Sequence, residues 1–330
     1  MTAQTDPTRS HRFWGRLFRW LCTAAALFGC LVLAALLAAV VWQAWGWLNW
    51  EFLTRYDSRR PTEAGIKAAL WGSFWLLLLT ALFAVPLSIS AAIYLEEYAR
   101  RTRLTALLQL NVNNLAGVPS IVIGILGLTA FVRMFGLFGN QPRPITVGFG
   151  PVAFTVQIPF GRSVLAGALT LALLIMPVLI VATQEALRAV PASIRHAALA
   201  LGASRWQTIR YQVLPAAAPG ILTGVILALS RAVGETAPLL MIGALSYVAF
   251  SPGGIERLSD LLSLQKLAGV PFSPFTVLPI QIFNWALRPQ SAYHHLAAAG
   301  IIVLLLLLFA LNAAAIYLRY RFRRRLSGRT

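Results

Sequence analysis

The sequence predicts an all-α integral membrane protein with six transmembrane helices, and three observations lead to this prediction. Of the 330 residues, 58% are hydrophobic and only 12% are charged, whereas soluble globular chains carry about 25% charged residues. The apolar residues gather in six runs, and each run is long enough to cross about 30 Å of hydrocarbon as a helix. None of the runs shows the period-two alternation of a barrel strand.

The six runs define the expected spans and divide the chain into three parts. The spans cover roughly residues 21–43, 67–94, 115–138, 163–183, 216–246 and 296–318. The first run is longer than the apolar core of a signal peptide, so we expect it to be retained as a span. The three parts are 1–65, with the N-terminal tail, the first span and an outer loop; 66–320, the main transmembrane domain; and 321–330, a basic tail.

The positions of the basic residues predict the orientation of the spans. The two tails and the second and fourth connections together carry 17 arginines, and the opposite side carries nine basic residues. Because cytoplasmic segments are enriched in Lys and Arg, both termini and the connection at 184–215 are expected in the cytoplasm. We therefore attribute the net charge of +18 to topology and to contact with membrane lipid. Nucleic acid is rejected as a partner, because the basic residues flank apolar runs.

Two connections on the outer side have recognisable character. The third connection, 139–162, contains four prolines among β-branched residues and is expected to be a short extended excursion. The fifth connection, 247–295, is expected to be an ordered outer loop with a re-entrant piece near Phe275–Leu287. Arg133, near the outer end of the third span, is expected to snorkel to the surface. The alternative is that it belongs to a substrate path.

The connection at 184–215 is longer than a tether between two spans requires. Pro191 suits the start of a helix and Gly202 suits its end. Four apolar residues between them recur at helical spacing: Ile194, Ala197, Ala198 and Leu201. On this pattern alone, a helix pair that docks on a soluble partner and a pair that lies on anionic lipid are equally favoured. A helix-turn-helix DNA reader is rejected, because the segment is pinned between spans.

The fifth run contains a pair of opposite charges. Arg231 follows Pro215 by 16 residues, which is about 24 Å along a helix and therefore near mid-membrane. Intramembrane charges usually face a protein interior or a cavity. Glu235 lies at i+4 and can pair with Arg231, Gly234 is expected to admit another backbone, and Pro238 is expected to break the helix. Either the pair locks the bundle, or the planar guanidinium binds a transported anion while Glu235 balances its charge.

Several segments resemble one family of transporters. AALALGASRWQTIRYQVLPAAAPGI resembles the coupling motif of ABC-importer permeases, in which five positions match: Ala197, Ala198, Gly202, Leu214 and Pro215. His196 stands where that family usually has Glu. The segments SRAVGETAPLL, YLEEYA and GVPSIVIGILG resemble the A-type permease of the phosphate-specific transport system. The resemblance covers about residues 66–320.

The resemblance implies a type I, MetI-like permease fold with a cytoplasmic coupling-helix loop. It implies import of inorganic phosphate across the bacterial inner membrane, with a substrate pathway at Arg231, Glu235 and Thr236. The implied coupling residues are Ile194, His196, Ala197, Ala198, Leu201, Gly202, Leu214 and Pro215. The implied partners are a C-type sister permease in a heterodimer, an ATP-binding cassette ATPase dimer and a periplasmic phosphate-binding protein. Sulfate or phosphonate import is the nearest alternative.

The chain is not expected to hydrolyse ATP itself. Its only lysines, Lys67 and Lys266, follow Ile66 and Gln265 and cannot form a Gly-Lys-Ser/Thr loop. We therefore expect ATP and Mg²⁺ on a partner ATPase and no cofactor or metal on this chain. A secondary anion transporter is a weaker hypothesis, because it would need several intramembrane acids and only Glu235 lies clearly inside a span. A structural or assembly protein of the membrane is the third hypothesis.

Overall fold

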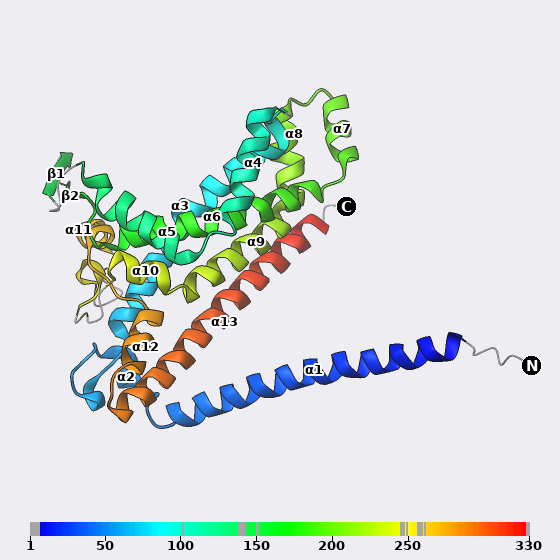
Figure 1. The fold of residues 1–330 in the computed structure, drawn as a ribbon. Coiled ribbons are helices and arrows are strands. Elements are labelled where there is room, and N and C mark those ends of the chain that lie inside the picture. The colour runs from blue at the N-terminus through cyan, green and yellow to red at the C-terminus, as the bar shows by residue number, and fades with distance from the viewer. Residues whose placement is uncertain are drawn as a thin grey trace, which may run out of the picture.

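Four long helices form a bundle, and a fifth long helix projects away from it (Figure 1). The computed structural model describes residues 7–100, 102–137, 143–149, 152–244, 248, 250–255, 260 and 262–327. The bundle helices are α3 (Lys67–Ile93), α6 (Val164–Arg188), α9 (Leu214–Gly234) and α13 (Ser291–Ser327), and the projecting helix is α1 (Pro7–Ala44). Among the described residues, five helices are long and apolar enough to cross a membrane, and one bent helix pair passes the same test when its two helices are taken together. The predicted helical membrane fold is confirmed.

Helix α6 lies at the centre of the bundle. In its most apolar stretch 67% of the residues are buried, whereas the corresponding stretches of α1 and α13 are 0% buried. Small residues let α9 approach α6 closely: a Cβ atom on Gly224 would lie 2.7 Å from Cβ of Ala182, and one on Gly220 would lie 2.8 Å from Cβ of Ala186. Membrane helices associate through such small residues. The apolar stretches of α1 and α13 are thus left largely for lipid or for another protein, although the first turns of α13 are buried.

The third span, predicted at 115–138, is wrong as a single straight helix. The predicted segment begins at the last residue of α4 (Arg103–Leu115) and contains α5 (Ser120–Gly127), the π-helical turn η3 (Leu128–Val132) and the 3₁₀ turn η4 (Met134–Gly136). The axes of α4 and α5–η3 are bent by 107° at the break between them. Pro119 lies in this break, and a proline disfavours the helical conformation of the residue before it. The apolar run continues across the proline, although the chain turns there.

The fifth span, predicted at 216–246, is also interrupted. Helix α9 ends at Gly234, and α10 (Ala237–Ile242) begins after two intervening residues. Pro238 lies in the first turn of α10, where its missing N–H breaks no helical hydrogen bond, so the break precedes the proline. Among the described residues, no other part of the chain lies within 4 Å of a Cβ built on Gly234, so the close approach expected there is not made by this chain. Residues 245 and 246 lie outside the described residues.

A further close approach of the fifth span, after its break, is at Gly124 of α5. A Cβ atom there would lie 2.7 Å from Cα of Pro238. The neighbouring atom belongs to the backbone, so no side-chain rotation can make room for it. Gly124 therefore lets α10 lie directly against α5, and this contact fixes the direction in which the chain continues after the break.

The end of the molecule that carries the β-hairpin is built from short elements (Figure 1). The strands β1 (Arg143–Phe149) and β2 (Val152–Ile158) pair antiparallel, with Arg143 opposite Ile158, which confirms the expected extended excursion. The other elements are α2 (Trp50–Thr54), η1 (Pro61–Glu63), η6 (Pro252–Gly254), α11 (Leu264–Gly269), η8 (Val270–Phe272) and α12 (Leu278–Ala286). Trp285 of α12 is fully buried and donates to Asp57 Oδ1 at 3.0 Å, which ties this end together. Helix α12 lies in the segment predicted to hold a re-entrant piece.

The opposite end of the molecule carries the segment predicted at 184–215. Its first residues are the last turn of α6, and its last residues begin a continuous helical run from Arg205 to Gly234. The two short helices α7 (Ala192–Ala200) and α8 (Arg205–Thr208) lie between, and the π-helical turn η5 (Ile209–Val213) leads into α9. The start of α1 and the end of α13 point toward this same end (Figure 1).

We expect Gly124→Ala to lower the thermal stability of the purified protein, because its methyl group meets the backbone of Pro238. Overpacked sites typically cost about 1–3 kcal/mol. Gly117→Ala is the matched control, since a Cβ there meets only the Asn114 carbonyl oxygen at 3.5 Å. Thermal unfolding followed by size exclusion compares the two variants. Equal stability of the two would contradict the close packing of α5 and α10.

Candidate functional site: the helix break at Glu235 and the α7–α8 segment

The α7–α8 segment is a pair of short helices joined at a glycine, as the sequence predicts. Gly202 has a φ of +83°, a left-handed conformation that favours glycine. Ser204 caps α8 by accepting from Gln207 N at 3.2 Å, and Gln207 Oε1 accepts from Ser204 N at 2.8 Å. This reciprocal cap fixes the start of α8 directly after the glycine turn.

The predicted apolar stripe does not lie on one surface. Ile194 packs against the buried cluster beneath the segment, whereas Leu201 is 89% exposed. Leu199 and Trp206 are also largely exposed, and the stripe alone did not single out Leu199. The outer surface of the segment therefore presents large apolar side chains that nothing in the described chain covers. Leu214 and Pro215 lie in the first turn of α9, beneath the segment.

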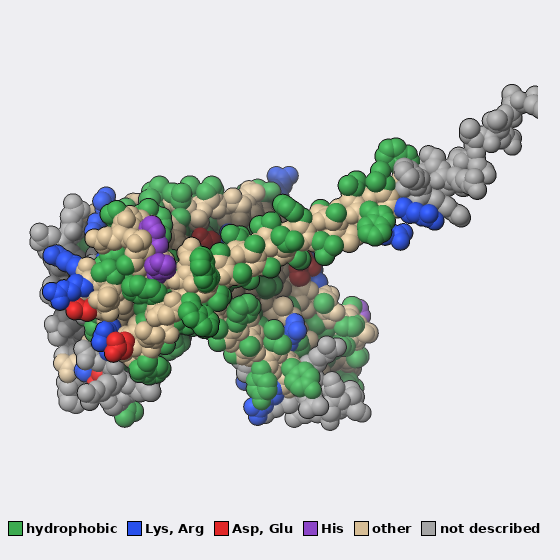
Figure 2. Space-filling model, turned by 90° about the horizontal axis from the view of Figure 1, so that it is seen from below, with side chains coloured by type: hydrophobic (Ala, Val, Ile, Leu, Met, Phe, Trp, Pro, Cys, Tyr) green, Lys and Arg blue, Asp and Glu red, His purple; other side chains and the backbone are tan. Residues whose placement is uncertain are grey.

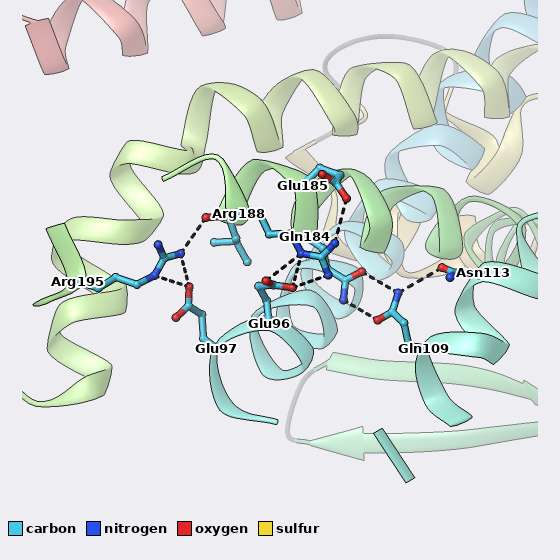
Figure 3. A network of polar contacts seen from close by, with 9 residues as sticks. Glu96, Glu97, Gln109, Asn113, Gln184, Glu185, Arg188 and Arg195 are labelled. Carbon is cyan, nitrogen blue, oxygen red and sulfur yellow. Dashed lines mark hydrogen bonds and ion pairs between the residues drawn. The ribbon is translucent and has the colours of Figure 1, made fainter. Parts of the chain in front are cut away.

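One ion pair holds this segment to the bundle, as part of a larger polar network (Figure 3). Arg195 of α7 contacts Glu97 at 2.7 Å and donates to the carbonyl oxygens of Leu187 at 2.9 Å and Val190 at 2.7 Å. Glu97 belongs to the π-helical turn η2 (Tyr94–Tyr98), which ends α3. Its side chain is 10% exposed. The arginine thus joins α7 to the ends of α3 and α6.

A second part of the same network joins α6 to its neighbours. Arg188 contacts Glu96 of η2 at 2.9 Å and Glu185 at 3.2 Å. Gln109 of α4 and Gln184 of α6 exchange hydrogen bonds of 3.1 and 2.9 Å (Figure 3). The two acids of YLEEYA entered the sequence analysis only through resemblance, and the structure gives them a physical role.

His196 lies on the outer surface of α7, adjacent in sequence to the anchoring Arg195. It is exposed and makes no hydrogen bond or ion pair with any residue in the described part of the chain. The carboxylate that holds the segment therefore comes from Glu97 of η2, and the residue at position 196 does not contribute to this attachment. Ala197 and Ala198 lie on the following turn, exposed and half-buried respectively.

The second candidate site is the helix break at the end of α9. Arg231 Nε lies 3.5 Å from Glu235 Oε1, so the expected pair forms, but with a long contact. The side chain of Arg231 is 46% exposed and that of Glu235 is 19% exposed. Glu235 has an extended backbone, and Thr236 precedes α10 without capping it through its side chain. Arg231 thus lies in the last turn of α9, and Glu235 and Thr236 form the two-residue break that follows it.

The geometry leaves Arg231 free to bind an anion. Its terminal nitrogens make no hydrogen bond within the residues that the structure describes, apart from the long contact of Nε with Glu235. A guanidinium offers five N–H donors in a plane that matches two oxygens of one anion. An arginine this exposed on a helix of a membrane span is costly in lipid, so it faces protein or water. The exposed part of the guanidinium is therefore available to a group outside this chain.

Comparisons with known proteins agree with this architecture. The family model of the binding-protein-dependent transport system inner membrane component matches residues 84–328. The probable ABC transporter permease protein YqgI of Bacillus subtilis is 32% identical over 65% of this chain and 65% of its own. The phosphate transport system permease protein PstA 1 of Mycobacterium tuberculosis is 35% identical over 64% of each chain. The chain thus spans just under two thirds of the length of these relatives. PstA of Yersinia pestis is 32% identical over 84% of this chain and 80% of its own.

Solved structures show the same fold at low sequence identity. A bacterial ABC transporter involved in the import of the polysaccharide alginate matches with a TM-score of 0.58 and 16% identity, over 94% of this chain and 99% of that chain. An inward-facing form of the MetNI methionine ABC transporter matches with a TM-score of 0.53 and 16% identity, over 77% and 96% of the two chains. The permease fold implied by the resemblance is confirmed. With most of its length matched by the family model, the chain belongs to the inner membrane components of binding-protein-dependent transport systems.

Proposed function

We propose that this chain is the membrane-spanning permease subunit of an ATP-driven importer that carries inorganic phosphate across the bacterial inner membrane. The observation that carries the proposal is the exposed Arg231 beside Glu235 at a break in a membrane span. Relatives over most of the chain are phosphate transport permeases by name, such as PstA of Yersinia pestis, and this favours phosphate over sulfate or phosphonate.

The proposed importer contains further subunits that this chain does not supply. An ATP-binding cassette ATPase dimer would hold ATP and Mg²⁺, a C-type sister permease would complete a heterodimer, and a periplasmic phosphate-binding protein would deliver the substrate. The exposure of α1 along its apolar stretch supports a partner within the membrane, and Figure 2 shows its hydrophobic side chains on the projecting arm. A solved alginate transporter with this fold is a complex with its periplasmic protein.

The orientation we propose has both termini and the α7–α8 segment in the cytoplasm. The basic residues support it, and the start of α1, the end of α13 and α7–α8 lie toward one end of the molecule (Figure 1). In a background with Cys22→Ser and Cys30→Ser, a membrane-impermeant thiol reagent added to the outside should label Thr62→Cys and miss Ala200→Cys. Both residues are exposed in this chain and lie at opposite ends. The reverse labelling pattern would sink the orientation.

The α7–α8 segment is proposed to dock on the ATPase. We expect Leu201→Glu to reduce ATP-driven uptake at least tenfold while the permease still inserts, because Leu201 is 89% exposed and loses no contact within the chain. A buried charge without a partner in the docked interface has a cost of that order. Thr62→Glu places the same charge at the opposite end and should transport normally. Copurification of the ATPase is measured with uptake, and normal copurification and uptake by Leu201→Glu would reject the docking.

The Glu97–Arg195 pair is proposed to hold the segment in a fixed position for coupling. We expect Glu97→Gln to destabilise the attachment of α7 by about 1–3 kcal/mol, because a largely buried charged hydrogen bond is lost. Trypsin should then cleave the α7–α8 segment faster. Glu63→Gln is the matched control, since the Arg60–Glu63 pair is exposed and such pairs contribute about 0–1 kcal/mol. Unchanged cleavage of Glu97→Gln would reject the anchoring role.

Arg231 is proposed to bind the transported anion, with Glu235 and Thr236 beside it. Arg231→Lys keeps the charge but loses the planar two-point contact, so we expect uptake to fall clearly while the complex assembles. Arg231→Leu combined with Glu235→Leu should also assemble and fail to import phosphate. Uptake and assembly of both variants are measured in parallel. Near-normal uptake by the double-leucine protein would make Arg231 and Glu235 a structural pair only.

A further inference from the structure

A cavity of about 670 Å³ lies at the end of the molecule opposite α7 and α8, where β2, η8 and the start of α6 meet. Two arginines from different elements line it, Arg133 after η3 and Arg162 before α6. Phe160 and Phe272 form an apolar part of its wall, with ring centroids 6.3 Å apart. Within the described residues, no Asp or Glu lines the cavity.

The backbone holds both arginines in place at the rim. Arg133 is followed by Met134 and Phe135, which have φ values of 46° and 54°. Non-glycine residues in this left-handed region are strained and persist only where the surroundings impose them. Gly161, directly before Arg162, donates its N–H to the carbonyl oxygen of Val132 at 3.3 Å. One backbone hydrogen bond therefore joins the two turns that carry the guanidinium groups.

The charge around the cavity is positive. Arg133 and Arg162 are both exposed and have no ion-pair or hydrogen-bond partner in the part of the chain that the structure describes. The neighbouring Asp260 is engaged by Lys266 at 2.8 Å. Ser163, also lining the cavity, is the N-cap of α6, so the positive end of the helix dipole lies at the cavity wall. Two free guanidiniums and a helix N-terminus together favour an oxyanion.

Helix α10 joins this cavity to the break at Glu235. Gly243 ends α10 with a φ of +85°, and a Cβ there would lie 2.8 Å from Arg162 Nε, so the arginine packs directly on this turn. The other end of α10 follows Thr236. The six residues of α10 span about 9 Å at 1.5 Å per residue. The two sites thus lie at opposite ends of one short helix.

We propose that this cavity is an outer oxyanion-binding site, in which Arg133 and Arg162 hold the anion before it reaches Arg231. The identity of the anion as phosphate rests on the proposed function, whereas the chemistry of the site requires only a small oxyanion. The proposal takes up the alternative that Arg133 belongs to a substrate path, because Arg133 lines a cavity together with a second arginine.

The test uses a cysteine reporter inside the cavity of the assembled importer. Gln157→Cys is placed in the background with Cys22→Ser and Cys30→Ser, in nanodiscs of phosphatidylcholine. An anionic methanethiosulfonate reagent should label this cysteine about tenfold faster than a cationic one of similar size, because the cavity concentrates anions. Added inorganic phosphate should slow the labelling. Arg133→Gln combined with Arg162→Gln should abolish both the preference and the protection, and size exclusion checks that this variant assembles.

Arg59→Gln is the matched control, because it removes one exposed arginine outside the cavity lining. It should keep the preference and the protection. Labelling without preference for the anionic reagent, or without protection by phosphate, sulfate or a phosphonate, would overturn the proposal. The labelling is repeated in discs that contain phosphatidylglycerol. Labelling that follows the lipid charge and ignores the added anions would assign the arginines to lipid headgroups and would equally overturn it.

Phosphate uptake by the unmodified importer, measured in parallel, separates this inference from the proposed function. Protection by sulfate or a phosphonate in an importer that does not take up phosphate would support the oxyanion site and reject phosphate as the substrate. Normal phosphate uptake without any protection at Gln157→Cys would reject the site and leave the proposed function standing.

Discussion

Close approach between helices is the constraint on which the rest of this structure depends. Lipid tails are as apolar as leucine, so helices in a membrane gain little by hiding apolar surface from them and must gain by packing. In this chain the packing is centred on α6, which meets α9 at Gly220 and Gly224. The same rule places α10 against α5 at Gly124. A side chain on any of these glycines would force the paired elements apart or strain their contact.

The charged groups around this packed centre differ in how well they are paired. Glu97 pairs closely with Arg195 at the end of the bundle that carries α7 and α8, where it ties a short element to a long one. Inside the span the contact between Arg231 and Glu235 is longer and more exposed. At the hairpin end, Arg133 and Arg162 have no described partner. These two arginines can therefore bind a ligand without first breaking an ion pair within the described chain.

Much of the fold could be predicted from the sequence, because apolar runs and glycine turns are local signals. The six apolar runs predicted a helical membrane protein, and Pro191 and Gly202 predicted the two short helices of the α7–α8 segment. The bend at Pro119 was missed, since composition alone does not show that a proline within an apolar run redirects the chain. A break at Pro238 was predicted, and the structure places the break at Glu235 and Thr236, just before the proline.

The candidate sites were predictable only where their residues are close in sequence. Arg231 and Glu235 are four residues apart, so helical spacing alone joins them. Arg195 and Glu97 are separated by 98 residues, and no periodicity connects them. The cavity at the hairpin end is a similar case, since Arg133 and Arg162 meet across a connection whose path the sequence did not specify. Such pairs become visible only when packing brings distant turns together.

Because helix α1 projects from the bundle, insertion of this subunit into the membrane and its binding to a partner can be separate steps. The apolar stretch of α1 is not buried by other parts of the chain. Lipid tails solvate such a surface without an energetic penalty, so the subunit can insert into the bilayer before it binds a partner. The apolar character of α1 therefore does not favour one partner protein over another, because lipid covers the same face equally well. Selection of a partner helix must then depend on the shape of the packing surface. Along α1, alanine and glycine are interspersed with leucine and tryptophan, so small and large side chains give this surface an uneven shape. A partner protein with a surface of complementary shape would then be selected by close packing.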